Sequence, residues 1–545
     1  MPLDMTPEQK AIGQGNFHRV VGKLAEAPAP EGQGITRRRF MQGLVAGAAA
    51  VPLSAAAYYG YSNSGFTGKP VKSGLIGAGD EGGVLVGEHN PAYVQFIAYS
   101  DIRPSNQVRI FNGEPSGPRR GFNFHYGNQA RKNIKLHENY KDLLANPEIE
   151  MVVIALPLHL HAQVAMDALK AGKHVLCEKL MAWNISQCKD MIHVADQTGK
   201  LLAIGHQRHY SMLYAHAVEV IKSGVLGDIR HIRALWHRNN TRPFPDPQGH
   251  EQTDPETGKL RMRDSWRQAV KEEDSRALAG RIKQMGYKDM NELVRWRLYN
   301  RTGGGLMAEL GSHQLDACSI FLNKVKPLAV TAVGGKHFYE DDREVEDHVY
   351  CTYEFPGRNY VRNRPARKTG GACEYNDTVV VTYSSISTND FEGYGECVMG
   401  TKGMMVIEKE ESVYLWGGAG RSTAVTVTTS GGGPKLDASS STDPADRRAA
   451  ATGQASLGAA PPSRGYREEM EHMAYCIRMR QEGMSRDRED LKLRCDGRAA
   501  MADAIIALTS NQAMRQQKRI DFQDSWFRDD STEVPDADMR VEEVS

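Results

Sequence analysis

The sequence predicts an α/β protein in which a doubly wound parallel sheet precedes an α+β domain with a large, mainly antiparallel, open-faced sheet. In the first part of the chain, short apolar runs alternate with helical patterns, which is typical of a parallel sheet covered by helices on both faces. Farther along, apolar runs follow one another without helical patterns between them, which favours antiparallel pairing. At 545 residues the chain is too long for one hydrophobic core, so two domains with appendages are expected.

The first domain is predicted over residues 70–206. Its strands are expected where apolar runs occur, at 71–79, 94–100, 151–156, 174–177 and 201–205. Helical patterns at 161–171 and 185–198 separate the later runs. Because these helix-length segments stand between strands, successive strands can pair in parallel through crossover connections.

The second domain is predicted over residues 207–465, with strands at 328–334, 348–355, 378–383, 404–408 and 410–416. Residues 240–300 are polar and charged, which predicts an insertion of loops and helices near the site. Residues 430–465 are rich in small and polar residues and predict a mobile, low-complexity surface loop. Helical patterns return at Tyr466, so residues 466–545 are expected to form C-terminal helices and a tail.

Composition limits the classes of partner. A hydrophobic content of 40% and a charged content of 25% are those of a soluble globular protein. The net charge is +1 and no dense Lys/Arg stripe occurs, which argues against a nucleic-acid partner.

Eight cysteines occur without CxxC pairs, so ordinary thiols are expected. Paired histidines at 159/161 and 206/209 have no carboxylate or cysteine at completing spacing, so no metal site is predicted.

The N-terminal region, residues 1–69, resembles a twin-arginine (Tat) export signal. Arg37, Arg38 and Arg39 precede Phe40, and an alanine-rich, mildly apolar core follows at 44–57. This core is too short to span a bilayer comfortably. The resemblance implies export by the Tat machinery to a periplasmic or other extracytoplasmic location, with the signal either cleaved or retained as a membrane tether. An amphipathic N-terminal arm on a cytoplasmic protein is the alternative.

A glycine-rich turn follows the first predicted strand and has the pattern G-x-G-x-x-G of a dinucleotide-binding Rossmann fold. It is formed by Gly77, Ala78, Gly79, Asp80, Glu81 and Gly82. The first glycine permits a tight turn, the second lets the backbone approach a pyrophosphate, and the third lets the helix pack closely against the strand. Asp101 ends the second strand, where a carboxylate favours the ribose hydroxyls of NAD. Arg103 could instead accommodate a 2′-phosphate, so NADP stays open, as does a glycine turn with no cofactor.

Several motifs together resemble the Gfo/Idh/MocA oxidoreductases over roughly residues 70–408. The matching residues are Pro157, His161, Ala171 to Val175, Glu178–Lys179, Gly205 to Tyr210, Gly224 to Gly227, and Gly303 to Asp316. Two departures occur. Leu180 stands where the family has proline after Glu-Lys, and Leu156 and Leu158 replace Thr and Asn around Pro157.

The resemblance implies a set of site residues. Besides the glycine turn and Asp101, the cofactor would contact Leu156, Pro157, His161, Glu178 and Lys179. His313 would be the base that takes the hydroxyl proton, and Lys179 would hold the reacting oxygen. Glu309, four residues before His313 and therefore on the same face of a predicted helix, would orient the substrate or tune the base. Sugar contacts are expected among Arg208, Tyr210, His237, Arg238 and Asn239.

These residues predict an NAD(P)-dependent oxidoreductase that transfers hydride between a nicotinamide and a hydroxyl-bearing carbon of a sugar, cyclitol or related polyol. Two other classes stay open. One is an NAD-dependent glycosidase that acts by transient oxidation and elimination, and the other is a noncatalytic sugar-binding protein. The open sheet face implies, from the family, a homo-oligomer.

Overall fold

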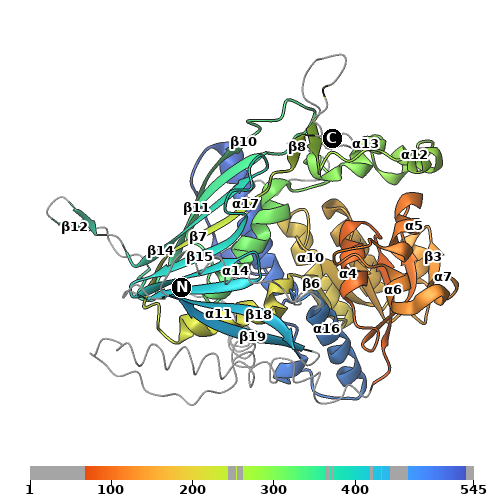
Figure 1. Ribbon diagram of the computed structural model, residues 1–545, viewed down its shortest axis with the longest axis horizontal. Helices are drawn as coiled ribbons and strands as arrows, with labels where there is room; N and C mark the ends of the chain where they lie inside the picture. Colours follow the sequence, from red (N-terminus) through yellow and green to blue (C-terminus); the bar gives the residue numbers. More distant parts are fainter. Residues whose placement is uncertain are drawn as a thin grey trace.

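The computed structural model describes residues 68–243, 253, 262–362, 367–369, 372–374, 376–417, 422–430, 433–441 and 464–535. Two bodies lie side by side, one built on a parallel sheet and the other on a larger sheet (Figure 1). The twin-arginine motif and the apolar core after it lie outside the described residues. In the part of the chain that the structure describes, no helix is both long and apolar enough to cross a bilayer.

The first sheet is parallel throughout, with the strand order β3-β2-β1-β4-β5-β6. Its strands are β1 (Val71–Ile76), β2 (Val94–Ser100), β3 (Lys135–His137), β4 (Met151–Ile154), β5 (His174–Glu178) and β6 (Leu202–Gly205). The sequence predicts all of them except β3, which is a three-residue strand with two exposed residues. The strand order reverses between β1 and β4, and this switch point leaves a crevice at the carboxyl ends of the strands.

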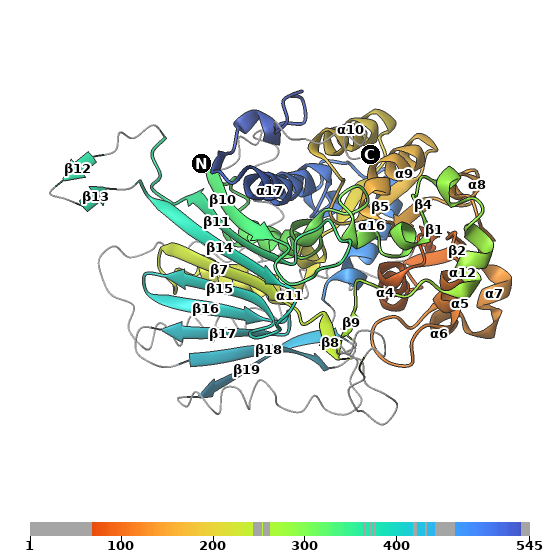
Figure 2. The same cartoon turned by 90° about the horizontal axis from the view of Figure 1, so that it is seen from above.

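Helices cover both faces of this sheet (Figures 1 and 2). They are α4 (Asp80–Glu88), α5 (Pro104–Asn112), α6 (Phe122–Tyr126), α7 (Ala130–Asn133), α8 (Tyr140–Leu144), α9 (His161–Lys170) and α10 (Ile185–Thr198). Helix α10 shows how local sequence sets their ends. The Asn184 side chain accepts a hydrogen bond from the Gln187 backbone at its start, and Gly199 ends it in the left-handed conformation.

Helix α16 (Tyr466–Gln481) is part of the first domain in space, although the sequence places it in a separate C-terminal segment. Met470 and Met473 are fully buried in the same hydrophobic cluster as β1 and β2. Arg478 also pairs with Glu150, just before β4, at 2.8 Å. The covering of the first sheet is therefore completed by a segment that follows β6 by about 260 residues along the chain.

The second sheet has ten strands in the order β19-β18-β17-β16-β15-β7-β14-β11-β10-β20, and only the β7–β14 pair is parallel. The central strands are β7 (Ile229–His237), β10 (Ala329–Gly335), β11 (His348–Pro356), β14 (Thr378–Ile386), β15 (Tyr394–Gly400) and β16 (Gly403–Glu408). Towards the edges lie β17 (Ser412–Gly417), β18 (Ser422–Ser430), β19 (Gly433–Ser441) and β20 (Ile520–Asp521). The predicted open-faced, mainly antiparallel sheet is confirmed.

Helices α11 (Met212–Lys222), α14 (Ser312–Phe321) and α17 (Gly497–Gln516) lie between this sheet and the first domain (Figures 1 and 2). The opposite face is open, and on it Val333 of β10 pairs in register with Tyr350 of β11. These two side chains are 66% and 45% exposed. Strands β10 and β11 alternate buried and exposed residues because only one face has a helical cover.

The prediction of a mobile loop over 430–465 is wrong where the structure describes it, because β19 occupies Gly433–Ser441. It pairs with β18, and Ser430 faces Gly433 across a two-residue hairpin loop. Thr and Val dominate 422–430, and a Gly-Gly pair connects the strands, which are strand and hairpin signals. The Ser/Thr/Gly composition conceals these signals. Residues 442–463 lie outside the described residues.

The described residues between 240 and 300 form loops and short helices, as predicted for the insertion. It contains β8 (Thr241–Pro243), β9 (Met262–Asp264), α12 (Glu272–Leu278) and α13 (Met290–Val294). A further hairpin, β12 (Arg367–Thr369) with β13 (Ala372–Glu374), extends from the large sheet.

The seven cysteines whose side chains are described are buried and free, as expected for ordinary thiols.

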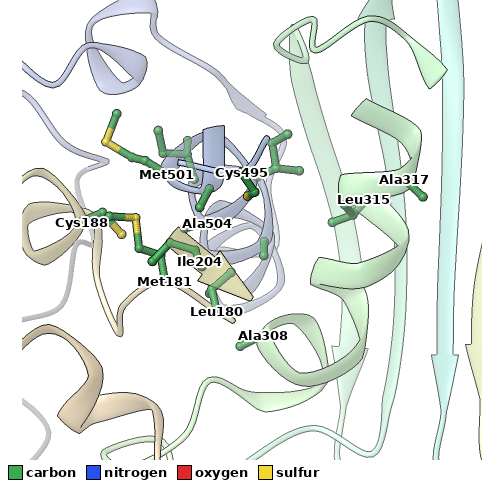
Figure 3. Close-up of a cluster of buried hydrophobic side chains, with 14 of the residues drawn as sticks. Leu180, Met181, Cys188, Ile204, Ala308, Leu315, Ala317, Cys495, Met501 and Ala504 are labelled. Carbon is green, nitrogen blue, oxygen red and sulfur yellow. The ribbon is translucent and has the colours of Figure 1, made fainter. Parts of the chain in front are cut away.

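A buried hydrophobic cluster joins the two domains (Figure 3). It contains Leu180, Met181 and Cys188 after β5, Ile204 of β6, Ala308, Leu315 and Ala317 near α14, and Cys495, Met501 and Ala504 near or in α17. Leu180 follows Lys179 directly, and Leu315 lies two residues after His313. The packing of this cluster therefore fixes the separation of the segments that hold these two candidate catalytic residues.

Candidate active site between the two domains

A cleft of about 1650 Å³ lies between the carboxyl edge of the parallel sheet and the second domain. Typical ligand pockets measure about 300–1,000 Å³, so this cleft has room for a dinucleotide together with a substrate. The glycine turn and Asp101 line one part of it. Lys179, Glu309 and His313 line another part, although they come from different domains.

The three glycines of the turn have the geometry that a pyrophosphate site requires. Gly77 has a φ of +96°, and a Cβ there would lie 2.2 Å from the carbonyl oxygen of Ala155. A Cβ on Gly82 would lie 2.1 Å from the carbonyl oxygen of Gly77. At Gly79, in contrast, a Cβ would meet nothing within 4 Å. Two glycines thus permit close packing, and the third leaves open space beside the backbone.

The N-terminus of α4 points its first-turn N–H groups at this space. Gly79 is the N-cap and provides no capping side chain, so these donors are left for a ligand. Asp80 does not oppose an anion strongly, because Arg109 binds its carboxylate at 2.7 Å. Burial alone would raise the pKa of Asp80, but the charges of Arg109 and Arg119 outweigh it and lower that pKa.

Asp101 has the position expected of a ribose-binding carboxylate. Its Oδ2 accepts hydrogen bonds from Ala78 N at 2.8 Å and Asn106 Nδ2 at 3.1 Å, and its Oδ1 accepts one from Arg103 N at 2.8 Å. These bonds fix the carboxylate beside the glycine turn. The Arg103 side chain pairs with the buried Asp274 at 2.9 Å. This pairing draws the Arg103 side chain towards Asp274, and the position of the Asp101 carboxylate fits the ribose of NAD.

Glu178 and Glu81 form a buried acidic pair at the centre of the cleft wall. Burial and the neighbouring Glu81 raise the pKa of Glu178 well above its ordinary value, and burial also raises the pKa of Glu81. The Oε2 of Glu178 accepts from Lys179 N at 3.2 Å, while its Oε1 is screened from solvent and has no hydrogen-bond partner among the described residues. A cofactor in the cleft would supply that missing partner, so the residues present fit a nicotinamide dinucleotide.

Leu156 and Pro157 line the cleft, but His161 does not. The His161 ring is buried behind them, with Nε2 2.9 Å from the Leu156 oxygen and Nδ1 2.8 Å from the Leu180 oxygen. A neutral imidazole can donate only one of these bonds. His161 therefore positions two backbone segments, and the prediction that it contacts the cofactor itself is not supported. The Lys179–Leu180 peptide is cis.

Lys179 and Glu309 meet at the domain boundary. The ammonium of Lys179 donates to the backbone oxygen of Glu309 at 2.9 Å. The Glu309 carboxylate accepts from Arg297 Nε at 2.7 Å. Burial alone would raise the pKa of Glu309, but Arg297 and Lys179 outweigh it, so that pKa is lowered and the carboxylate is ionised.

The helix that was expected to hold both Glu309 and His313 is not a continuous α-helix. Met307–Gly311 forms a π-turn, and α14 begins only at Ser312. Such turns occur frequently at functional sites because they shift side chains around the helix axis. Both side chains nevertheless line the cleft.

His313 is buried, and its ring centroid lies 5.2 Å from that of Trp236. Burial lowers the pKa of His313 well below its ordinary value, and the charges of Lys179, Arg208, His206 and Arg238 lower it further. The imidazole is therefore neutral at physiological pH, which is the form that can accept a proton.

Of the five expected sugar contacts, only Arg238 lines the cleft. The buried Arg208 binds Glu396 and Glu410 and donates to the His313 backbone oxygen at 2.6 Å, so it is a positioning residue. The Tyr210 hydroxyl accepts from Arg494 N at 3.2 Å, away from the cleft. His237 bonds to Phe391 O and Ser384 Oγ. The predictions for Arg208, Tyr210 and His237 as substrate contacts are corrected accordingly, and Asn239 is likewise outside the lining.

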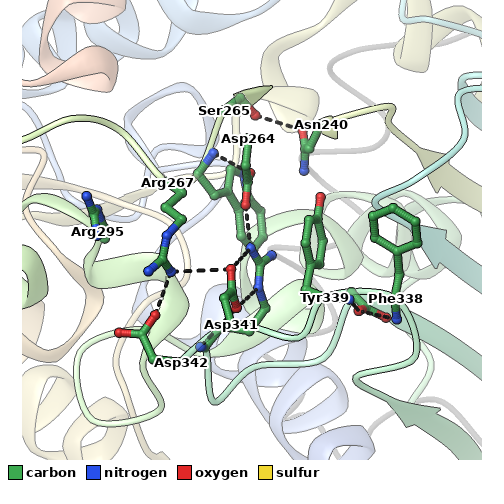
Figure 4. A network of polar contacts seen from close by, with 12 residues as sticks. Asn240, Asp264, Ser265, Arg267, Arg295, Phe338, Tyr339, Asp341 and Asp342 are labelled. Atoms are coloured by element: carbon green, nitrogen blue, oxygen red, sulfur yellow. Dashed lines mark hydrogen bonds and ion pairs between the residues drawn. The ribbon is translucent and has the colours of Figure 1, made fainter. Parts of the chain in front are cut away.

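Several lining residues are not predicted from the sequence: Trp236, Trp266, Trp296, Arg297, Tyr394, Arg464 and Tyr466. At the mouth, Arg267 pairs with Asp341 and Asp342, and Arg343 pairs with Asp264 and Asp341 (Figure 4). This network ties the 240–300 insertion to the segment before β11. In the sequence, only the polarity of residues 240–300 points to these lining residues. It predicts that the insertion lies near the site but does not identify single residues.

Comparison with known proteins agrees with this geometry. A family model described as "Oxidoreductase family, NAD-binding Rossmann fold" matches residues 118–206, and a model of the "GFO/IDH/MocA C-terminal domain" matches residues 276–406. An inositol 2-dehydrogenase/D-chiro-inositol 3-dehydrogenase of Lactiplantibacillus plantarum is 36% identical over 108 residues, which are 20% of this chain and 31% of that protein. The chain aligns with only about a third of the length of the first curated relatives that it matches.

Solved structures share the fold over most of the chain. An inositol dehydrogenase homolog from Azotobacter vinelandii, complexed with NAD⁺, matches with a TM-score of 0.55 and 16% identity. The match covers 83% of this chain and 98% of that one. An aldose-aldose oxidoreductase from Caulobacter crescentus matches with a TM-score of 0.50 and 17% identity, over 83% and 100% of the two chains. Residues 118–206 are thus similar to the NAD-binding Rossmann domain, and residues 276–406 to the C-terminal domain, of the Gfo/Idh/MocA oxidoreductases.

Proposed function

We propose that the protein is an NAD-dependent oxidoreductase that acts on a hydroxyl-bearing carbon of a sugar, cyclitol or related polyol. The observation that best supports this proposal is that Lys179 and the neutral imidazole of His313 line the same cleft as the glycine turn. The substrate class follows relatives named inositol dehydrogenases and a structural neighbour described as complexed with NADH and myo-inositol.

The residues divide the chemistry of alcohol oxidation between them. When bound, NAD takes up the hydride that leaves the carbinol carbon. His313 accepts the hydroxyl proton, and Lys179 donates a hydrogen bond to the same oxygen as negative charge develops there. Because one of the three Lys179 donors is used on the Glu309 backbone, its ammonium is held in place and two donors remain. In the reverse direction His313⁺ returns the proton to the carbonyl oxygen.

A low pKa would by itself make His313 a weak base. The charge of Lys179 that lowers the pKa of His313 also lowers that of a hydroxyl bound between the two residues. The difference between the two groups, which governs proton transfer, is therefore smaller than the shift of His313 alone suggests. Glu309 is fixed by Arg297 and faces the same cleft, so we assign it to orienting the substrate.

Native mass spectrometry of protein purified without added cofactor tests the cofactor assignment, and absorbance at 340 nm tests turnover on a panel of sugars and inositols. We expect bound NAD and stoichiometric NADH formation with at least one polyol. A glycosidase would instead release a sugar leaving group without net reduction of added NAD. If the protein binds no dinucleotide and catalyses neither reaction, the proposal is contradicted.

We also propose that the chain is exported by the twin-arginine route to an extracytoplasmic location. The support is the Arg37–Arg38 pair followed by a weakly apolar core. Enzymes that bind a dinucleotide during cytoplasmic folding need a route for folded proteins, and this pathway provides one.

A homo-oligomer is proposed through the open face of the large sheet. Val333 and Tyr350 leave apolar surface exposed there, next to Thr331 and Thr352 on the same face. Contiguous exposed apolar surface of this kind is typical of association sites. Replacing Val333 by Lys should shift the native mass towards the monomer, whereas an unchanged subunit number would exclude this face.

A further inference from the structure

Arg238 is a cation without an anionic partner inside the cleft. It follows β7, and its guanidinium carbon lies 4.8 Å from the centre of the Trp236 ring. Among the described residues no carboxylate pairs with it. Arg267 at the mouth, in contrast, pairs with both Asp341 and Asp342 (Figure 4). Of these two arginines, Arg238, which lies closer to the proposed base, is therefore the one without a carboxylate partner among the described residues.

Arg238 lies close to the proposed base. The Trp236 ring that it covers is 5.2 Å from the His313 ring, and the charge of Arg238 lowers the pKa of His313. The indole thus lies between the base and the unpaired cation. A molecule the size of one sugar ring can reach both groups.

A second cation, Arg464, lines the same cleft as the stack of Trp236 and Tyr394. Trp236 stacks on Tyr394 at 4.5 Å with an interplanar angle of 12°. Arg464 lies over Tyr466 at 5.3 Å, and its charge opposes the burial that raises the pKa of Tyr394. Arg464 forms a long ion pair of 4.0 Å with Oε2 of Glu410, whose Oε1 accepts both bonds from Arg208, so Arg464 is only partly neutralised.

The positive charges around His313 are not fully neutralised by carboxylates among the described residues. Lys179, Arg238, Arg297 and Arg464 line this part of the cleft. Glu309 neutralises Arg297, while burial raises the pKa values of Glu81 and Glu178 and so favours their uncharged forms. Arg238 is exposed to the cleft, and its pKa is lowered by its surroundings and by Arg297 while the charge of Glu309 opposes this shift. An anionic ligand would remove this imbalance.

We propose that the substrate is an acidic sugar or polyol whose carboxylate binds Arg238 while its reacting hydroxyl faces His313. The planar guanidinium fork matches a carboxylate in two parallel hydrogen bonds and stacks on an indole at the same time. Trp236, stacked between Arg238 and Tyr394, holds the guanidinium in the cleft beside the position of a sugar ring. The inference rests on the proposed function, because it assigns the substrate class for the same site.

The first test compares pairs of sugars that differ only in CH₂OH against COO⁻, such as glucose with glucuronate and galactose with galacturonate. The acidic member of at least one pair should have a kcat/KM about 10- to 100-fold higher, which is the contribution of a charge-assisted hydrogen-bonded pair. Equal values, or a preference for the neutral member throughout, would overturn the proposal. A preference for a sugar phosphate over the carboxylate would overturn the carboxylate assignment.

The second test uses Arg238→Gln with Arg233→Gln as its matched control. Arg233 lies on β7, the strand that Arg238 follows, is 47% exposed and pairs with Glu392 outside the cleft. Arg238→Gln should lower kcat/KM for the acidic sugar about 10- to 100-fold and leave the Kd for NAD unchanged, while Arg233→Gln changes neither. An equal effect of Arg238→Gln on the acidic and the neutral sugar would overturn the assignment.

Binding separates this inference from the proposed reaction. Quenching of tryptophan fluorescence in the NAD-loaded protein reports binding of glucuronate or galacturonate next to Trp236 without any turnover. Salt-sensitive binding that Arg238→Gln removes would support the anion site even if no polyol were oxidised. Oxidation of neutral polyols with no binding of either acid would instead retain the proposed function and reject the acidic substrate.

Discussion

Gly79→Ala should abolish tight NAD binding while leaving the fold intact. A methyl group at this position meets no protein atom within 4 Å, and the Gly79 φ of −75° is accessible to alanine. The methyl group would enter the open side of the glycine turn, where the backbone must approach a pyrophosphate. The substitution therefore removes space for the ligand without removing a contact within the protein.

The magnitudes follow from this geometry. Alanine restricts the unfolded chain, which adds about 0.4–1 kcal/mol to the free energy of unfolding, but it is a poorer N-cap than glycine by a similar amount, so this free energy should change little. Each hydrogen bond from a backbone N–H to a charged phosphate contributes about 1.5–3 kcal/mol, so loss of one weakens NAD binding about 10- to 150-fold. Affinity and stability should thus change independently.

Gly77→Ala is the matched control, because its added carbon is equally small. There φ is +96° and the Cβ would lie 2.2 Å from the Ala155 oxygen. The left-handed conformation alone costs about 1–2 kcal/mol, and relief of the overlap adds to it, so Tm should fall by at least roughly 2 °C.

Calorimetric titration gives the Kd for NAD, and differential scanning calorimetry gives Tm. Gly79→Ala protein with wild-type NAD affinity would show that the pyrophosphate does not lie on this turn. Gly77→Ala protein with wild-type Tm would show that the close approach of the turn to Ala155 is not maintained in solution.

Three further outcomes are expected. His313→Ala should lower kcat about 10²–10⁴-fold with little change in the Kd for NAD. The double variant with Lys179→Ala should lose less activity than the product of the two single losses, because both residues act in one transition state. Near-normal turnover by His313→Ala would reject His313 as the base. Burial and neighbouring cations lower the pKa of His313, so its neutral, active form persists in mild acid. The acidic limb of the plot of kcat/KM against pH should therefore lie below pH 6.5. A limb above pH 6.5 would contradict the electrostatics of the site. Changing Arg37 and Arg38 together to Lys should retain the protein in the cytoplasm by cell fractionation, and undiminished export would exclude the twin-arginine route.

The parts of the site that local sequence determines are the parts that could be predicted. The turn at 77–82 is set by a strand, three glycines and a helix in succession, so its pattern is visible within about 20 residues. Lys179 and His313 each stand in a motif of neighbouring residues, and both line the cleft. Asp101 ends a buried strand of recognisable length.

The substrate side could not be predicted because tertiary packing decides which side chains reach the cleft. Arg208 and Arg238 look equivalent in the sequence, yet one is turned inward to Glu396 and Glu410 and the other lines the cleft. Arg464 reaches the cleft only because α16 packs on the first domain. The periodicity that suggests an α-helix through Glu309 also gives no sign of the π-turn.

The position of α16 has a consequence for how the chain folds during synthesis. The sheet of the first domain is complete at β6, but one of its faces lacks the Met470 and Met473 cover until about 260 further residues have been translated. At about 5–20 residues per second, this interval lasts roughly 13–52 s. The nascent chain must therefore keep an apolar sheet face from aggregating while the whole second domain emerges from the ribosome. If the N-terminal arginines direct export, they too must remain unused until α16 has docked, so a folded first domain requires most of the chain to have been translated.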